Sequence, residues 1–139
     1  TRGSNEFIGS KDGSIGTPVG LMKFLIQLEQ GKVVDEKSSL EMKRLMYMTD
    51  RRIRYAQAPV LKDAAVYFKS GSLYKCDRSK GEACGKYMGN VQNFMNSVAI
   101  VEHPNGKKYM VALMTNVLRK NSASDHMYLA GSIDKLINK

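Results

Sequence analysis

The sequence lacks the features of a membrane-spanning protein. Its 139 residues contain no apolar run of the roughly 18 residues that a bilayer span requires. Residues 1–16 are polar and rich in glycine and serine, without the basic and apolar stretches of a signal peptide. We therefore expect a globular chain of one domain, which is either cytosolic or has lost its start.

Acidic residues are scarce relative to basic ones. The chain has 13 Asp and Glu against 22 Lys and Arg, a formal charge of +9, which favours an anionic partner such as nucleic acid, an acidic surface or a carboxylate-bearing small molecule. The only tight basic cluster is Arg51, Arg52 and Arg54, and aromatic residues do not interleave with basic ones as in RNA-binding motifs. A basic, solvated surface is therefore favoured, and no nucleic-acid partner is expected.

Cysteine and histidine are rare as well, with two of each. Cys76 and Cys84 share one polar segment, which favours a disulfide and an oxidising compartment, with two free thiols as the alternative. The spacing is not Cys-x-x-Cys, and His103 and His126 lie in a turn and near a helix start. The sequence therefore predicts neither a metal site nor a cofactor.

Local signals predict two helices in the first part of the chain. Thr17 offers a capping hydroxyl and Pro18 suits the first helical position, so a helix is expected to run to about Gln30. Ser38 and Glu41 form a capping-box pattern, which opens a second helix ending near residue 50. The apolar side chains expected to be buried are Val19, Met22, Leu25, Ile26 and Leu28 in the first helix and Met42, Leu45, Met46 and Met48 in the second.

Three β-prone runs follow, at 64–69, 94–102 and 108–116. Asn105 and Gly106 join the last two as a hairpin, and the nearly continuous apolar character of both predicts burial on both faces. Ser122 and Ser124 offer caps for a final helix. The side chains expected to pack that helix on the sheet are Met127, Leu129, Ile133, Leu136 and Ile137. The expected fold class is α/β in the α+β sense, an antiparallel meander packed by helices.

The most informative stretch is the segment 69–72, Lys69-Ser70-Gly71-Ser72, which follows an apolar β-prone run. Lysine supplies a compact positive charge, serine a short donor and acceptor, and glycine lets a ligand approach the strand closely. This combination is typical of a carboxylate-binding strand edge. The alternative is a solvated strand end that turns into a loop.

Together with the order of the elements, this segment resembles the C-terminal part of a serine β-lactamase or penicillin-binding protein of the class A β-lactamase-like group. Gly16, Thr17 and Pro18 resemble the helix start that follows the omega loop of that family, and Lys69-Ser70-Gly71 resembles its Lys-Thr/Ser-Gly box. The resemblance implies that 17–139 is the C-terminal part of such a domain. It implies that 1–16 is a flexible omega-loop region or linker.

The resemblance also implies a reaction and roles for the segment 69–72. The reaction is acyl transfer to a serine, with a β-lactam or a D-Ala-D-Ala-type peptidoglycan peptide as substrate, in a bacterial periplasm or secreted. Lys69 would attract the substrate carboxylate and assist proton movement, and the Ser70 hydroxyl would bind that carboxylate. Gly71 would keep the strand edge open, and the Ser72 N–H would be an oxyanion-hole donor.

Other parts of the family pattern are not matched in this chain. The resemblance assigns it neither the nucleophilic Ser-x-x-Lys motif nor a Ser-Asp-Asn-type box. Glu6 lies closer to Thr17 than the family's spacing would put the deacylating glutamate. We expect these groups upstream, in an N-terminal remainder of the same domain, and we expect the chain alone to be inactive. The alternatives are a non-catalytic module that binds an anionic partner, and a basic nucleic-acid-binding α/β domain. The basic rim that such a module would use is Lys75, Arg78, Lys80 and Lys86.

Overall fold

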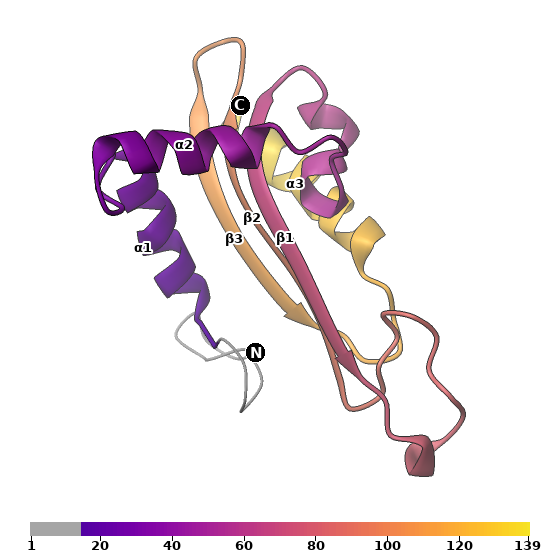
Figure 1. Ribbon diagram of the computed structural model, residues 1–139. Coiled ribbons are helices and arrows are strands. Elements are labelled where there is room, and N and C mark those ends of the chain that lie inside the picture. The colour runs from indigo at the N-terminus through magenta and orange to yellow at the C-terminus, as the bar shows by residue number, and fades with distance from the viewer. Residues whose placement is uncertain (1–14) are drawn as a thin grey trace.

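The computed structural model describes residues 15–139, which form a three-stranded antiparallel sheet in the order β1-β2-β3, with helices on both faces (Figure 1). The helices and strands are α1 (Pro18–Glu29), α2 (Glu36–Tyr47), β1 (Ala65–Lys75), β2 (Gln92–Glu102), β3 (Lys108–Asn116) and α3 (Ala123–Ile137), with short 3₁₀ turns η1 (Arg54–Gln57), η2 (Pro59–Leu61) and η3 (Arg78–Lys80). This confirms the predicted fold class and element order. The expectations for residues 1–14, Glu6 included, lie outside the described residues.

The sheet separates two apolar cores, because β2 is buried on both faces. Ile100 packs with Leu25 and Leu28 of α1 on the face that α1 and α2 cover. Ala99 and Val101 point to the other face, where α3, η1 and η2 pack. All three β2 residues are 0% exposed, so the predicted burial on both faces is confirmed for residues 99–101. It is wrong for β3, where Tyr109 alone is buried.

Strand β1 is longer than its own sequence pattern predicts. The apolar alternation ends at Lys69, but the strand continues to Lys75, in unbroken register with β2 from Ala65 opposite Glu102 to Lys75 opposite Gln92. Glycine and serine are poor strand formers, so the pairing with β2 overrides their local preference. The expected end at residue 69 is therefore wrong, and the segment 69–72 lies in the middle of an edge strand.

Helix caps were predicted with mixed success. Thr17 caps α1 as expected, since its Oγ1 accepts a hydrogen bond from the Gly20 N–H at 3.0 Å. The expected Ser38 cap of α2 is wrong, because Asp35 is the N-cap and its carboxylate accepts from the Ser38 N–H at 2.6 Å. At α3, Ser122 takes the N-cap position without a side-chain cap bond.

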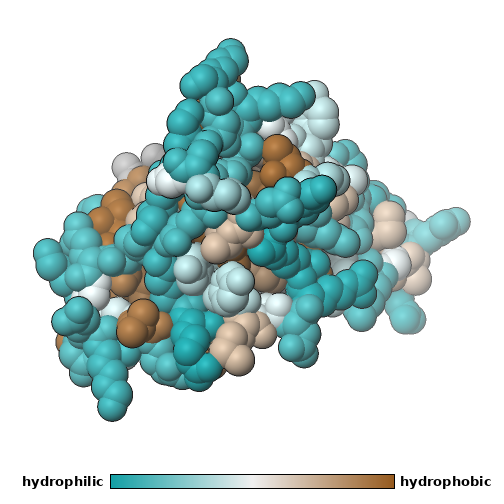
Figure 2. Space-filling model, turned by 90° about the horizontal axis from the view of Figure 1, so that it is seen from above, coloured by the Kyte–Doolittle hydropathy of each residue, from teal (hydrophilic) through white to brown (hydrophobic). Residues whose placement is uncertain are grey.

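Part of each predicted apolar stripe is exposed. Met42 and Met46 pack on the core beneath α2, and Met127, Ile133 and Ile137 pack beneath α3. The stripe residues that are exposed instead are Ile26, Leu45, Met48, Leu129 and Leu136. From above, apolar patches accordingly lie between the hydrophilic side chains (Figure 2). The helical periodicity therefore predicted the side of each helix that faces the core, but it predicted a buried stripe wider than the one observed.

Charged side chains join the helices of one face to the sheet. The Lys43 Nζ lies 2.7 Å from a carboxylate oxygen of Glu29 and 2.9 Å from one of Glu102. The Lys108 Nζ lies 3.0 Å from Glu102 and also pairs with Glu29. These four groups connect α1, α2, β2 and β3 around the rim of the apolar core.

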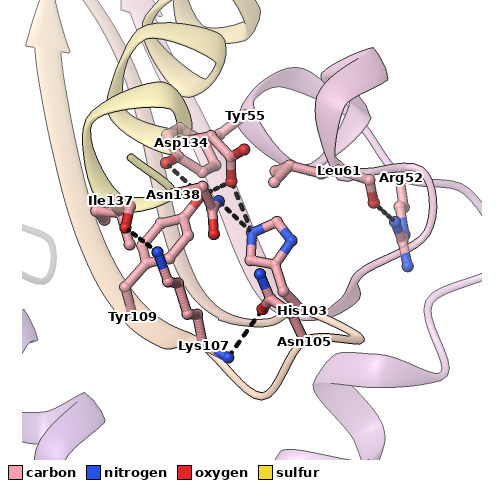
Figure 3. Close-up of polar contacts among 10 residues, drawn as sticks. All are labelled: Arg52, Tyr55, Leu61, His103, Asn105, Lys107, Tyr109, Asp134, Ile137 and Asn138. Carbon is pink, nitrogen blue, oxygen red and sulfur yellow. Dashed lines mark hydrogen bonds and ion pairs between the residues drawn. The ribbon is translucent and has the colours of Figure 1, made fainter.

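A buried polar cluster fastens α3 to the β2–β3 hairpin and to η1 (Figure 3). Asp134 is 4% exposed, and its Oδ1 lies 2.7 Å from His103 Nε2 and accepts from the Tyr109 hydroxyl at 3.3 Å. The Tyr109 hydroxyl in turn lies 3.3 Å from that of Tyr55 in η1. Asp134 is therefore the common partner of His103 and Tyr109, and Tyr55 joins the cluster through Tyr109.

We predict that Asp134→Ala lowers the free energy of unfolding by about 3 kcal/mol, because it removes the acceptor that the half-buried His103 and the buried Tyr109 share. Denaturant unfolding of the purified chain measures this loss. The matched control is Asp63→Ala, which removes an exposed carboxylate 4.0 Å from Lys62 and should cost less than about 0.5 kcal/mol. Equal losses in the two variants would contradict the structural role of the Asp134 cluster.

Candidate functional site

The segment 69–72 lies on β1, which is an edge strand of the described sheet. Lys69 is exposed, and its Nζ donates to the Ser70 carbonyl at 2.6 Å. Ser70 and Ser72 are half-buried and share the strand face of Val66 and Phe68. A Cβ added at Gly71 would meet nothing within 4 Å, so the space beside this residue is open.

The backbone of the segment 69–72 also offers donors at this edge. Bonded and non-bonded pairs alternate along an antiparallel ladder, and the His103 N–H donates to the Lys107 carbonyl at 2.9 Å, which fixes the phase of that alternation. The same alternation continues across β2. The backbone N–H and C=O groups of odd-numbered β1 residues therefore point toward β2. The N–H groups of Ser70 and Ser72 therefore point outward from the sheet.

Arg54 is a site residue that the sequence analysis missed. It belongs to η1, and its guanidinium donates to the Gly71 carbonyl at 2.7 Å and to the Ser72 Oγ at 3.0 Å. Burial lowers the pKa of Arg54, and the nearby Tyr87 acts in the opposite direction. The signal in the sequence was the cluster of three arginines, which was interpreted as solvated surface.

His126 lies beneath this site and was also missed as a site residue. It is 1% exposed; its Nε2 lies 3.2 Å from the Thr115 Oγ1 and its Nδ1 lies 3.3 Å from the Ser97 Oγ. The Thr115 hydroxyl already donates to the Met95 carbonyl at 2.6 Å, so it accepts from His126 Nε2–H. Burial lowers the pKa of this imidazole, so the ring is neutral at pH 7 and Nδ1 accepts from the Ser97 hydroxyl.

The spacing Ser-x-x-Lys does occur in the chain, at 72–75 and at 132–135, and the sequence analysis passed over both. Ser72 and Lys75 are three residues apart on a strand, so their side chains lie on opposite faces. Ser132 lies on α3, where its hydroxyl donates to the Tyr128 carbonyl at 3.2 Å. Neither spacing pairs a serine with a lysine beside the segment 69–72.

The predicted disulfide between Cys76 and Cys84 is present, which removes the alternative of two free thiols. It closes the loop that leaves the end of β1 and projects past the sheet at the lower right of Figure 1. The rim residues Lys75, Arg78, Lys80 and Lys86 are all exposed. Among residues 15–139, no group of three or more His, Cys, Asp or Glu could hold a metal ion, and no helix is long and apolar enough to cross a membrane.

An antiparallel sheet between helices, with a Lys-Ser-Gly segment on its edge strand, is the arrangement of the serine β-lactamase and penicillin-binding protein fold. Residues 1–138 match the model of the family described as the Beta-lactamase enzyme family. The chain belongs to this family. None of the curated proteins matches it.

Solved structures agree with this assignment at the level of the fold. The chain is 18% identical to the TLA-1 extended spectrum β-lactamase, with a TM-score of 0.67 over 89% of this chain and 42% of that chain. For a β-lactamase from Chitinophaga pinensis DSM 2588 the identity is 18% and the TM-score 0.61, over 87% of this chain and 43% of the other. For a PBP-A mutant, solved as an acyl-enzyme complex with penicillin G, the identity is 16% and the TM-score 0.57, over 90% of this chain and 42% of the other. The chain thus spans about two fifths of the length of these proteins.

The burial of His126 predicts a pH-dependent stability. Burial lowers the pKa of this imidazole from 6.5, and the charge of Arg54 lowers it further, so the unfolded chain binds a proton more readily than the folded chain. The contribution of the neutral His126 to the free energy of unfolding is complete above about pH 6.5. It is lost as the pH falls below that value, by at most about 1.4 kcal/mol per pH unit.

We therefore expect His126→Gln to flatten the loss of unfolding free energy between pH 7 and pH 5. Urea unfolding at a series of pH values measures it. The matched control is His103→Gln, which removes the other histidine and should retain the part of the slope that belongs to His126. An unchanged slope in His126→Gln would show that His126 does not titrate as a buried neutral group.

Proposed function

We propose that this chain forms the carboxylate-binding side of the active site in a penicillin-recognising serine hydrolase that acts on β-lactams or D-Ala-D-Ala-type peptides. The observation that carries the proposal is a pair of cations, Lys69 on the edge strand and Arg54 of η1, whose charged groups meet at the segment 69–72. Lys69 and Arg54 donate only to carbonyl and hydroxyl oxygens, those of the segment 69–72 and, for Arg54, also the Asn96 carbonyl at 3.4 Å, and within residues 15–139 no carboxylate pairs with either. Their charge is therefore free to attract an anionic ligand.

Each member of the segment 69–72 has a role in this proposal. Lys69 supplies positive potential for the substrate carboxylate and assists proton movement, and the Ser70 hydroxyl donates to that carboxylate. Gly71 leaves the strand edge open to the substrate backbone. The outward N–H of Ser72 is one donor of the oxyanion hole, a contribution of about 3–4 kcal/mol to the barrier in other acyl-transfer enzymes.

The acylated serine and its base come, in this proposal, from an N-terminal remainder of the same domain. Two facts support it: the matched proteins are more than twice as long as this chain, and neither Ser-x-x-Lys spacing lies beside the segment 69–72. The disulfide fits an oxidising compartment, so we propose a periplasmic or secreted location.

A charge-removal variant tests the role of Lys69 in the protein that joins this chain to its N-terminal remainder. We predict that Lys69→Ala lowers the rate of acylation by a fluorescent penicillin about 10- to 150-fold, because a hydrogen bond to a charged group is worth about 1.5–3 kcal/mol. The melting temperature should be nearly unchanged, since Lys69 is exposed and makes no ion pair within residues 15–139.

The matched control for Lys69→Ala is Lys75→Ala, which removes an exposed lysine from the end of the same strand. It should be labelled at close to the unmodified rate. Ser70→Thr should also be nearly silent, because threonine keeps the hydroxyl. If Lys69→Ala is labelled as fast as the unmodified protein, the segment 69–72 is only scaffold and the assignment is wrong.

We also predict that the isolated 139-residue chain does not hydrolyse a chromogenic β-lactam. In this proposal its own serines are not the nucleophile. Absorbance at saturating substrate measures the rate, with the protein that carries the N-terminal remainder as the positive control. Turnover by the pure chain, with a covalent adduct located by mass spectrometry on one of its serines, would overturn the division of roles.

A second candidate function is a non-catalytic module that binds an anionic partner, and the exposed basic rim of the disulfide loop favours it. Reversing charge at Lys80 and Lys86 distinguishes the two proposals. If the rim is the functional site, the change abolishes binding to a polyanion such as heparin. In the hydrolase proposal, the same change leaves penicillin labelling of the protein that carries the N-terminal remainder intact.

A further inference from the structure

A chain of hydrogen bonds leads from the buried His126 to the residue opposite Ser70. The neutral ring accepts from the Ser97 hydroxyl through Nδ1 and donates to Thr115 through Nε2. Ser97 lies directly across the ladder from Ser70. The phase of the ladder makes these two residues a non-bonded pair, in which Cα atoms are about 4.5 Å apart and side chains on one face are closest.

Proton uptake would reverse the hydrogen bond between Nδ1 and Ser97 and leave the Nε2–H donation to Thr115 as it is. A protonated imidazole donates from both nitrogens, so the Ser97 oxygen would have to accept from Nδ1–H and its own hydrogen would turn away from the ring. The residue directly opposite on β1 is Ser70, whose hydroxyl is proposed to bind the carboxylate. If Ser97 donates to the Ser70 oxygen, the Ser70 hydrogen stays available for a ligand.

Two charged groups face His126 from the elements packed around it. Arg54 of η1 opposes a positive charge on the ring, and Asp125 of α3 favours it. Strands β2 and β3 contribute the neutral hydroxyls of Ser97 and Thr115. Asp125 is already paired with Lys120 at 2.6 Å, so Arg54 is the stronger influence.

We propose that His126 links proton uptake to the binding of a carboxylate at the edge of β1, as a positioning residue that acts through Ser97 and Arg54. A carboxylate held by Arg54 and Ser70 offsets the repulsion between Arg54 and a protonated His126. Linkage is reciprocal, so acid tightens carboxylate binding by the same factor by which the ligand favours protonation. This inference rests on the proposed function of the segment 69–72.

Nuclear magnetic resonance of the full chain tests the link, with N-acetyl-D-alanine as the probe because its carboxylate stays ionised above pH 5. The imidazole nitrogens of His126 report its tautomer and titration, and the amides of Ser70 and Ser72 report binding. We expect the Nε2–H tautomer at pH 7.5 and an affinity about fivefold higher at pH 5.5 than at pH 7.5, within the usual range of coupling between sites.

Variants separate His126 from other groups that titrate. His126→Gln and Ser97→Ala should remove most of the pH dependence of binding. His103→Gln is the matched control and should keep it, because His103 lies at the other end of β2, beside Asp134. The titration of the unmodified chain needs no variant, so the test stands even if a variant fails to fold.

The outcomes distinguish this inference from the proposed function. Binding with the same affinity at both pH values, or with a pH dependence that survives in His126→Gln, overturns the link and leaves the carboxylate site intact. Absence of binding at every pH overturns the carboxylate site. In that case the coupling between His126 and Ser70 is tested in the ligand-free chain. A Ser70 amide signal that follows the titration of His126 supports the coupling, and a Ser70 signal that does not change with it overturns the coupling.

Discussion

The burial of β2 on both faces is the constraint on which the rest of the structure depends. Its central residues Ala99, Ile100 and Val101 exclude water completely, so the ladder bonds on either side of them must be made. That requirement fixes the register of β1 at residues 66–68, and the same register continues through the weak strand formers of the segment 69–72. A surface strand with the same sequence would end earlier, and its cation, hydroxyl and backbone donors would not share one edge.

The candidate site combines this edge with groups from distant parts of the chain. Arg54 comes from η1, which packs against α3, and His126 comes from α3 itself. The cluster around Asp134 fastens α3 at the opposite end of the sheet. The position of Arg54 at the Gly71 carbonyl therefore depends on contacts far from the site, and a change in the Asp134 cluster is expected to alter the site through α3 and η1.

Polar groups lie within an otherwise apolar layer beneath β1, and each bond there restricts the next. The Thr115 hydroxyl donates to Met95, so His126 donates to Thr115 and, while its ring is neutral, accepts from Ser97. A satisfied chain of this kind is stable only in one protonation state, because a second proton has no acceptor without rearrangement. The proposed link between pH and carboxylate binding follows because protonation of His126 forces the Ser97 hydrogen bond to change direction.

The sequence by itself determined the order of the elements, the Thr17 cap, the Asn105-Gly106 hairpin and the disulfide loop, because each depends on residues close together in the chain. It also picked out the segment 69–72. Only the tertiary structure decided how far β1 extends and where Arg54 and His126 lie, because their partners are far away in the sequence. It also decided that neither Ser-x-x-Lys spacing lies beside the segment 69–72, since the same spacing has different consequences on a strand and on a helix.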